Sequence, residues 1–189
     1  MYLFSCNTSG DLQPAKYLRY MESNNSTRQT IISGNTEYII QLATADYMAC
    51  REYSEQLQDT NTELLKSRIN ELEGHIFFII NVSKNDLGGS VIDDIQKKQK
   101  AGEMIMYYQS LAANDISLFC DEQQFFPATY HYEDNYGLAP YNTIVVGFQL
   151  PELQSGLKLV FNDRYNDNPY IQATYSKKTL KNLPTLVIK

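Results

Sequence analysis

The sequence has no tryptophan, two histidines, three cysteines and no long apolar run. A structural zinc site needs four Cys or His ligands at short spacings, and the scattered residues here do not provide them, so we predict no metal site. No glycine-rich loop has the lysine and spacing of a phosphate-binding motif, and we predict no cofactor. The most hydrophobic segment, His75–Val82, is much shorter than the roughly 20 residues that span a bilayer, so it predicts a buried strand.

An excess of basic charge is also missing. The formal net charge is −6, whereas a nucleic-acid-binding domain normally carries a basic surface, so we predict no nucleic-acid partner. The 189 residues are 43% hydrophobic and 20% charged, which is typical of an ordinary globular protein. Length and composition together predict a single domain with a sizeable core.

Tyrosine is abundant, with 15 residues beside 8 phenylalanines. Its apolar ring and polar tip suit both half-buried strands and contact surfaces. Two interpretations are therefore open: strand propensity in a sheet-rich fold, or an aromatic binding surface.

The segment Leu3-Phe4-Ser5-Cys6 resembles a lipobox, the signal at which a lipoprotein precursor is cleaved before a lipidated cysteine. Leu3 and Ser5 fit that pattern, whereas Phe4 is bulkier than the usual residue. A signal peptide also has a basic region and an apolar region of about 7–15 residues, which five residues do not supply. We predict a partial signal peptide and polar tether over residues 1–13, lipidation of Cys6, and one domain over residues 14–189. The alternative is an ordinary cysteine in an N-terminal strand.

The chain also resembles an uncharacterised family of exported lipoproteins of Gram-negative envelopes. The segments that carry this resemblance are Lys16–Glu22, Ile40–Leu42 with Tyr47, Ser67–Glu73, Tyr130–Tyr141 and Leu180–Pro184. The resemblance implies a location in the cell envelope, at the outer membrane. The lipobox predicts a lipid anchor in that membrane. Together with the acidic domain and the lack of a catalytic motif, it also predicts an envelope protein as partner. The resemblance implies no reaction.

Local patterns predict strands and helices in the first half of the chain. Residues 15–22 alternate partly and predict a first strand, and Gly34-Asn35 predicts a hairpin turn between strands 28–33 and 36–44. In the second arm, Tyr38, Ile40 and Leu42 are expected on one face. Asp46 is expected to cap a short helix that runs through Leu57, and the capping box of Thr60–Glu63 predicts another helix, which Gly74 ends.

In the second half, residues 91–113 are predicted to be helical with a break at Gly102. Strands are predicted at the following ranges: 116–120, 128–132, 143–150, 157–162, 170–175 and a terminal strand within 180–189. Runs of strands with clustered helices predict an α+β fold, mainly an antiparallel sheet with two to three helices from the middle of the chain.

One polar and aromatic stretch is the candidate binding surface, formed by Tyr130, His131, Tyr132, Glu133, Tyr136 and Tyr141. On a strand, Tyr130 and Tyr132 share one face, and His131 and Glu133 share the other. A histidine beside a carboxylate can perform acid–base chemistry, although no nucleophile motif accompanies it. The Asn- and Asp-rich segment 162–169 is predicted to be a turn and not a calcium loop.

Cys50 and Cys120 remain if Cys6 is lipidated. They are either a disulfide, as an exported chain allows, or two free thiols.

Three functions are compatible with these patterns. The first is a non-enzymatic lipoprotein that binds a protein as an accessory subunit of an outer-membrane complex. The second is a lipoprotein that binds a glycan or peptide through Tyr- and Asn-rich loops. The third is a hydrolase centred on His131 and Glu133. We rank them in this order because no catalytic motif is present.

Overall fold

The computed structural model describes residues 10–56, 62–84, 98–133, 139–150 and 155–188. Nine strands form two antiparallel sheets in this described part of the chain. The first sheet has the order β1-β2-β3-β7-β6, and the second has the order β5-β4-β8-β9. The strand bounds are β1 Arg28–Ser33, β2 Thr36–Thr44, β3 His75–Lys84, β4 Ile116–Cys120, β5 Gln123–Phe125, β6 Thr129–Glu133, β7 Asn142–Gln149, β8 Leu157–Asn162 and β9 Tyr170–Tyr175.

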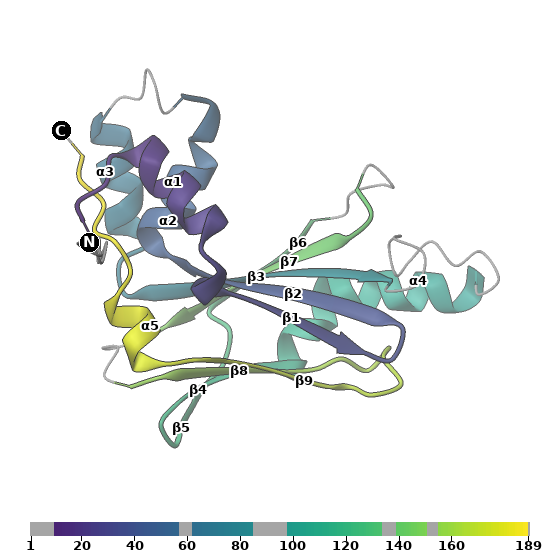
Figure 1. The fold of residues 1–189 in the computed structure, drawn as a ribbon. Helices are drawn as coiled ribbons and strands as arrows, with labels where there is room; N and C mark the ends of the chain where they lie inside the picture. The colour runs from purple at the N-terminus through teal and green to yellow at the C-terminus, as the bar shows by residue number, and fades with distance from the viewer. Residues whose placement is uncertain (1–9, 57–61, 85–97, 134–138, 151–154, 189) are drawn as a thin grey trace, which may run out of the picture.

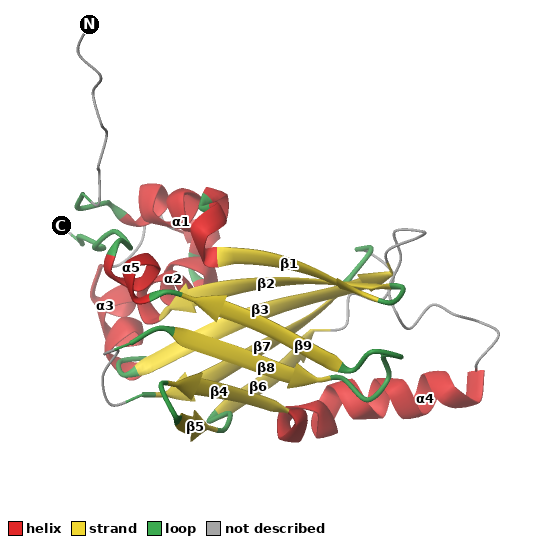
Figure 2. Cartoon of the chain, turned by 60° about the horizontal axis from the view of Figure 1, so that its bottom comes forward, coloured by secondary structure: helices red, strands yellow, loops and turns green. Residues whose placement is uncertain are grey.

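Helices stand at the two ends of these sheets (Figure 1). Their bounds are α1 Pro14–Ser23, α2 Ala45–Glu52, α3 Thr62–Glu71, α4 Lys98–Met106 and α5 Lys177–Lys181. Shorter turns of helix are η1 Asn25–Thr27, η2 Ser54–Gln56, η4 Tyr107–Leu111 and η5 Ala112–Asp115. Helices α1, α2 and α3 gather over one end of the five-stranded sheet, and α4 lies at the opposite end (Figure 2).

The main core lies between the two sheets. Tyr38, Ile40 and Leu42 of β2 are buried there, as the alternation predicted. Phe78 of β3 packs against Tyr175 of β9 with ring centroids 5.6 Å apart. Each such side chain contributes roughly 1.5–3 kcal/mol through burial, so this aromatic interior dominates the stability of the fold.

A second, smaller core joins the outer face of the five-stranded sheet to the helices. Tyr17 and Met21 of α1 and Leu65 of α3 pack there against Phe77 of β3. The domain therefore has three layers, which are helices, a five-stranded sheet and a four-stranded sheet. The predicted α+β class is confirmed, but the division into two sheets was not foreseen.

Several predicted elements are correct. The hairpin of β1 and β2 turns at Gly34, whose φ of 56° suits glycine, and it has the predicted bounds. Gly74, with a φ of 76°, ends the helical region before β3. α2 begins after Thr44, whose side chain accepts a hydrogen bond from the Tyr47 amide at 3.1 Å, so Thr44 caps the helix and not Asp46. The predicted cap at Thr60 lies outside the described residues.

Other predictions are wrong. Residues 14–23 form α1 and not a strand, because Pro14 begins the helix and Tyr17, Leu18 and Met21 share one buried face at helical spacing. The C-terminal segment forms α5, with only an isolated bridge between Leu12 and Leu186, and no terminal strand. Helices thus occur near both ends of the chain as well as in its middle.

The predicted break at Gly102 is absent, since Gly102 lies inside α4, where an exposed glycine costs only about 1 kcal/mol. The helix becomes irregular five residues later, where it continues as the π-helical turn η4. This turn brings the adjacent residues Tyr107 and Tyr108 into the main core together. Leu111, at the end of the same turn, is exposed.

Candidate functional site

A polar groove crosses the outer face of the five-stranded sheet beyond the edge of the helical layer. The strand register aligns its floor in two neighbouring rows. One row is Ile39, Asn81, Thr143 and Glu133, and the other is Arg28, Gln41 and Ile79. The groove therefore spans from the edge strand β1 to the opposite edge strand β6.

The next row along the same face is closed. Ala43 and Phe77 are buried under the helices, and Gly147 continues the row on β7. A side chain at Gly147 would lie within 3 Å of Phe77 and Thr129, so only glycine fits there. The groove begins where the strands change from these small and apolar residues to polar ones.

Helices and a loop supply the walls of the groove. Tyr47 and Arg51 lie one turn apart on α2 and line the same side, because residues four apart share a helix face. Glu22 near the end of α1 and Tyr141 just before β7 complete the lining. The resulting cavity has a volume of about 350 Å³, within the usual range of ligand sites of about 300–1,000 Å³.

Among the described residues, four charged side chains line the groove: Glu22, Arg28, Arg51 and Glu133. Two are positive and two are negative, so their formal charges cancel. Arg51 Nη2 and Glu133 Oε2 are 3.5 Å apart, and each side chain is 35% exposed. This contact is longer than the about 2.7–2.9 Å of a strong charge-assisted hydrogen bond. Such a loose, half-exposed ion pair contributes little to folding and leaves both groups able to change partners.

Tyr47 lies among these charges and is largely buried. Burial raises its pKa, the Glu22 carboxylate raises it further, and Arg51 and Arg28 oppose the rise. The hydroxyl group therefore stays protonated at neutral pH and can both donate and accept a hydrogen bond.

The floor also offers hydrogen-bonding groups. Asn81 Oδ1 accepts a hydrogen bond from the Thr143 hydroxyl at 3.0 Å. Gln41 Nε2 donates to the backbone carbonyl of Met21 at 2.8 Å. These bonds fix the two amide side chains, and each amide has further donor or acceptor capacity for a ligand.

The structure divides the binding surface that the sequence predicted. Glu133 and Tyr141 line the groove. His131 is on the same face of β6 as Glu133 but is exposed and outside the groove lining. Tyr130 and Tyr132 point the other way, as the alternation predicted, and pack against the main core.

These two tyrosines have a structural role. The Tyr130 hydroxyl donates to the backbone carbonyl of Tyr108, and the Tyr132 ring stacks on the Tyr108 ring at a centroid distance of 6.1 Å. They hold the edge strand β6 to η4 and do not line the groove. Tyr136 lies outside the described residues.

The sequence analysis missed Arg28, Arg51, Glu22 and Tyr47. They are spread over β1, α2 and α1, and only the fold brings them together. The one local signal is the polar residue Asn81 on the outer face of the apolar strand β3, opposite Ile39. A polar residue at such a position indicates that part of the outer face is not covered by helices.

A second polar cluster is closed inside the sandwich. Asp163 is completely buried, and its Oδ2 accepts hydrogen bonds from the hydroxyls of Tyr38 and Tyr108, both at 2.7 Å. Its Oδ1 accepts the Tyr165 amide at 3.0 Å. Asn166 donates to the Tyr38 hydroxyl at 2.8 Å and to the Ser33 carbonyl at 3.1 Å. The cluster therefore ties the turn after β8 to both sheets.

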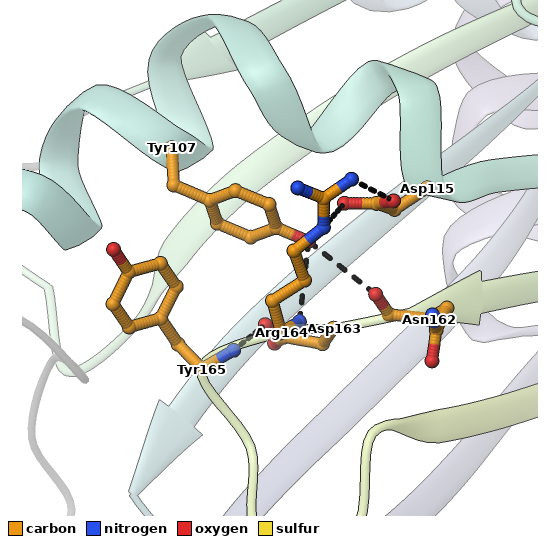
Figure 3. Close-up of polar contacts among 6 residues, drawn as sticks. All are labelled: Tyr107, Asp115, Asn162, Asp163, Arg164 and Tyr165. Carbon is orange, nitrogen blue, oxygen red and sulfur yellow. Dashed lines mark hydrogen bonds and ion pairs between the residues drawn. The ribbon is translucent and has the colours of Figure 1, made fainter.

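Burial raises the pKa of Asp163, although the hydrogen bonds from Tyr108, Tyr38 and the Tyr165 amide act against the rise. Beside it, Arg164 forms an ion pair with Asp115 at 2.7 Å, and the Tyr107 hydroxyl approaches the Asn162 carbonyl (Figure 3). The predicted turn at residues 162–169 is confirmed. The side chains of Asp163, Arg164 and Asn166 in this segment bind other groups of the protein itself.

Cys50 and Cys120 do not form the disulfide considered above. Both are free thiols, Cys50 in the helix–sheet core and Cys120 beside the core between the sheets. Cys120 Sγ is 3.2 Å from the Ser155 hydroxyl, and burial raises the pKa of Cys50 to about 12. Cys6 lies outside the described residues.

Residues before α1 are bonded to the C-terminal segment. The Leu12 amide donates to the Thr185 carbonyl at 2.9 Å, and the Leu12 carbonyl accepts from the Val187 amide at 2.8 Å.

In the described part of the chain, no group of three or more His, Cys, Asp or Glu side chains is arranged to hold a metal ion. No helix described in the structure has the length and apolar character needed to cross a membrane.

Comparisons of the chain with protein-family models, curated proteins and solved structures found no match. The resemblance to exported lipoproteins therefore stays a prediction.

Proposed function

We propose that this domain is a non-enzymatic binding protein whose groove takes a small polar ligand of the peptide or glycan class. The observation that supports the proposal most strongly is the convergence of Arg28, Arg51, Glu22 and Glu133 on one concave surface of the sheet. Such charges are not needed to hold the fold together, since the Arg51–Glu133 pair is loose and half exposed.

The groove favours a ligand binder over the other two hypotheses. Its lining combines aromatic and apolar contacts from Tyr47, Ile39 and Ile79 with a few polar groups, as small-molecule sites do. A hydrolase would need a nucleophile or an activated water near its acid–base residues. The lining contains no Ser, Cys or His among the described residues, and His131 is exposed outside it.

A binding screen tests the proposal. The full chain would be screened by saturation-transfer NMR against two pools, one of neutral oligosaccharides and one of amino acids and short peptides. We expect a hit from at least one pool, and we expect Arg51→Gln to weaken it. Arg19→Gln is the matched control, since Arg19 is an exposed arginine of α1 outside the groove. The proposal is wrong if neither pool binds, or if both variants bind like the wild type.

A second candidate function has its own observation. Exposed Met106 and Leu111 line a mainly apolar depression of about 400 Å³ together with Tyr107 and Tyr165. Exposed apolar surface of this kind marks protein-interaction sites, which suits an accessory subunit. Leu111→Glu would then remove a partner that the wild type retains in a pull-down from native membranes. A partner retained by both proteins would contradict this role for the depression.

We also propose the envelope as the location of the protein, with Cys6 as its lipid anchor. Mass spectrometry of the mature protein would show an acylated N-terminal cysteine, and Cys6→Ala would abolish the modification and release the protein from membranes. An unmodified wild-type Cys6 would contradict this proposal.

A further inference from the structure

The charges of the groove restrict the chemical class of the ligand more than the shape of the groove does. On the basis of the proposed binding function, we infer that the groove binds a zwitterion, that is, an amino acid or short peptide with a free ammonium group and a free carboxylate. The Glu133 carboxylate would take the ammonium group, and the Arg51 guanidinium would take the carboxylate. The observation that suggests this exchange is the loose contact between these two side chains.

Charge balance is the first argument. Two arginines and two glutamates cancel in formal charge, so a singly charged ligand would leave an unbalanced charge in the groove. An uncharged glycan would shield the four charges from water without pairing them, which is unfavourable. A zwitterion adds one charge of each sign and keeps the balance.

The Arg51–Glu133 contact is the second argument. The two side chains are 3.5 Å apart and come from different layers, α2 and β6. When a zwitterion enters, its carboxylate can form the two parallel hydrogen bonds that a guanidinium prefers, and its ammonium group can donate to Glu133. One weak ion pair is thereby replaced by two charge-assisted contacts.

The distance between the two ends of the groove accommodates ligands of more than one length. Arg28 is on the edge strand β1 and Glu133 is on the opposite edge strand β6. Four strand spacings of about 4.8 Å place their backbones roughly 19 Å apart. Tyr47 lies between the two ends, close enough to Glu22, Arg28 and Arg51 for each to shift its pKa. A free amino acid would use the Arg51–Glu133 end, and a short peptide would extend toward Arg28.

The floor matches the middle of such a ligand. Asn81 and Gln41 offer amide groups that can pair with a peptide bond, and Ile39 and Ile79 offer apolar surface to a side chain. On β2 and β3 each apolar floor residue lies opposite a polar one, Ile39 opposite Asn81 and Ile79 opposite Gln41, so both kinds of contact are available in the groove.

The test uses ligands whose ends are blocked one at a time. The full chain is screened with the twenty amino acids and their homodipeptides, and the best ligand is then titrated by calorimetry in four forms. These forms are free, N-acetylated, C-amidated and blocked at both ends. We expect each single block to weaken binding about tenfold or more, as the loss of one charge-assisted contact implies, and the double block to abolish it.

Variants assign each end of the ligand to a side chain. Glu133→Gln is expected to make the free and N-acetylated forms bind equally, and Arg51→Gln to make the free and C-amidated forms bind equally. Glu122→Gln and Arg19→Gln, at exposed positions outside the groove, should preserve the wild-type differences. Circular dichroism spectra and melting temperatures equal to those of the wild type establish that the variants are folded.

The outcomes separate this inference from the proposed function. Equal binding of the free and doubly blocked forms, or binding of neutral oligosaccharides alone, overturns the zwitterion and leaves a polar-ligand binder. Loss of every ligand, including oligosaccharides, overturns both. If neither Glu133→Gln nor Arg51→Gln alters binding of the free form, the placement of the ligand in this groove is wrong.

Discussion

The two polar clusters of this domain differ in how completely the protein satisfies them. In the closed cluster, both carboxylate oxygens of Asp163 accept hydrogen bonds of 2.7–3.0 Å from neighbours in fixed positions. In the open groove, Arg51 and Glu133 approach each other only to 3.5 Å and are half exposed. Polar groups that stabilise a fold are buried and fully paired, whereas groups available to a ligand keep unsatisfied capacity. The comparison predicts that mutations in the first cluster affect stability and mutations in the second affect binding.

The largest effect on stability is expected from Asp163→Ala. The substitution leaves the buried hydroxyls of Tyr38 and Tyr108 without their acceptor, and it should lower the free energy of unfolding by about 3 kcal/mol. Urea unfolding measures this loss. Asp167→Ala, an exposed neighbour in the same turn, is the control and should change stability by less than about 0.5 kcal/mol. Similar losses in both variants would contradict a special role for Asp163.

The ionisation of Asp163 makes stability depend on pH. Because burial raises its pKa in the folded state, the unfolded chain loses this proton at lower pH than the folded protein does. The contribution of Asp163 is therefore most favourable below its unfolded pKa of about 3.9, and it is lost as pH rises through the folded pKa.

The matched variant for this prediction is Asp163→Asn, which cannot ionise. We expect the difference in unfolding free energy, wild type minus variant, to fall as pH rises from 3.5 to 7. Urea unfolding at several pH values measures it. A difference that stays constant or increases would show that the folded-state pKa of Asp163 is not raised.

A smaller effect is expected from a single hydroxyl. Tyr38→Phe removes the group that donates to Asp163 and accepts from Asn166, and it should cost about 1–2 kcal/mol. The same substitution at Tyr47, which lines the open groove, should cost less than about 0.5 kcal/mol, because water can reach the groove. Equal costs at the two sites would remove the distinction between the clusters. Thermal and urea unfolding of both variants make the comparison.

The closed parts of the fold were the easier ones to predict from sequence. The β1–β2 hairpin follows from Gly34, and the burial of Tyr38, Ile40 and Leu42 follows from strict alternation. α1 was mistaken for a strand because its partial alternation was given more weight than the helical spacing of Tyr17 and Met21. The three-residue strand β5 was missed because so short a segment has no period to detect.

The groove could be predicted only in part. Glu133 and Tyr141 belong to a conspicuous stretch of sequence, but Arg28 and Arg51 are ordinary surface arginines until the fold is known. Their convergence depends on the register of five strands and on where the helical layer ends, and neither is encoded locally. Tyr130 and Tyr132 of the same stretch face the other side of the sheet and pack against the main core.

The smallest effect on stability, and the one that distinguishes the clusters most sharply, is expected from Arg51→Gln. A partly exposed ion pair at 3.5 Å contributes about 0–1 kcal/mol, so the free energy of unfolding measured in urea should fall by less than about 1 kcal/mol. If the groove is a binding site, the same variant should lose most of its affinity for the ligand found in the screen. An unfolding free energy lowered by more than about 1 kcal/mol would mean that Arg51 serves the fold, as Asp163 does. Since Arg51 lies on α2 and Glu133 on β6, such a loss would identify the pair as a structural link between the helical layer and the edge of the sheet.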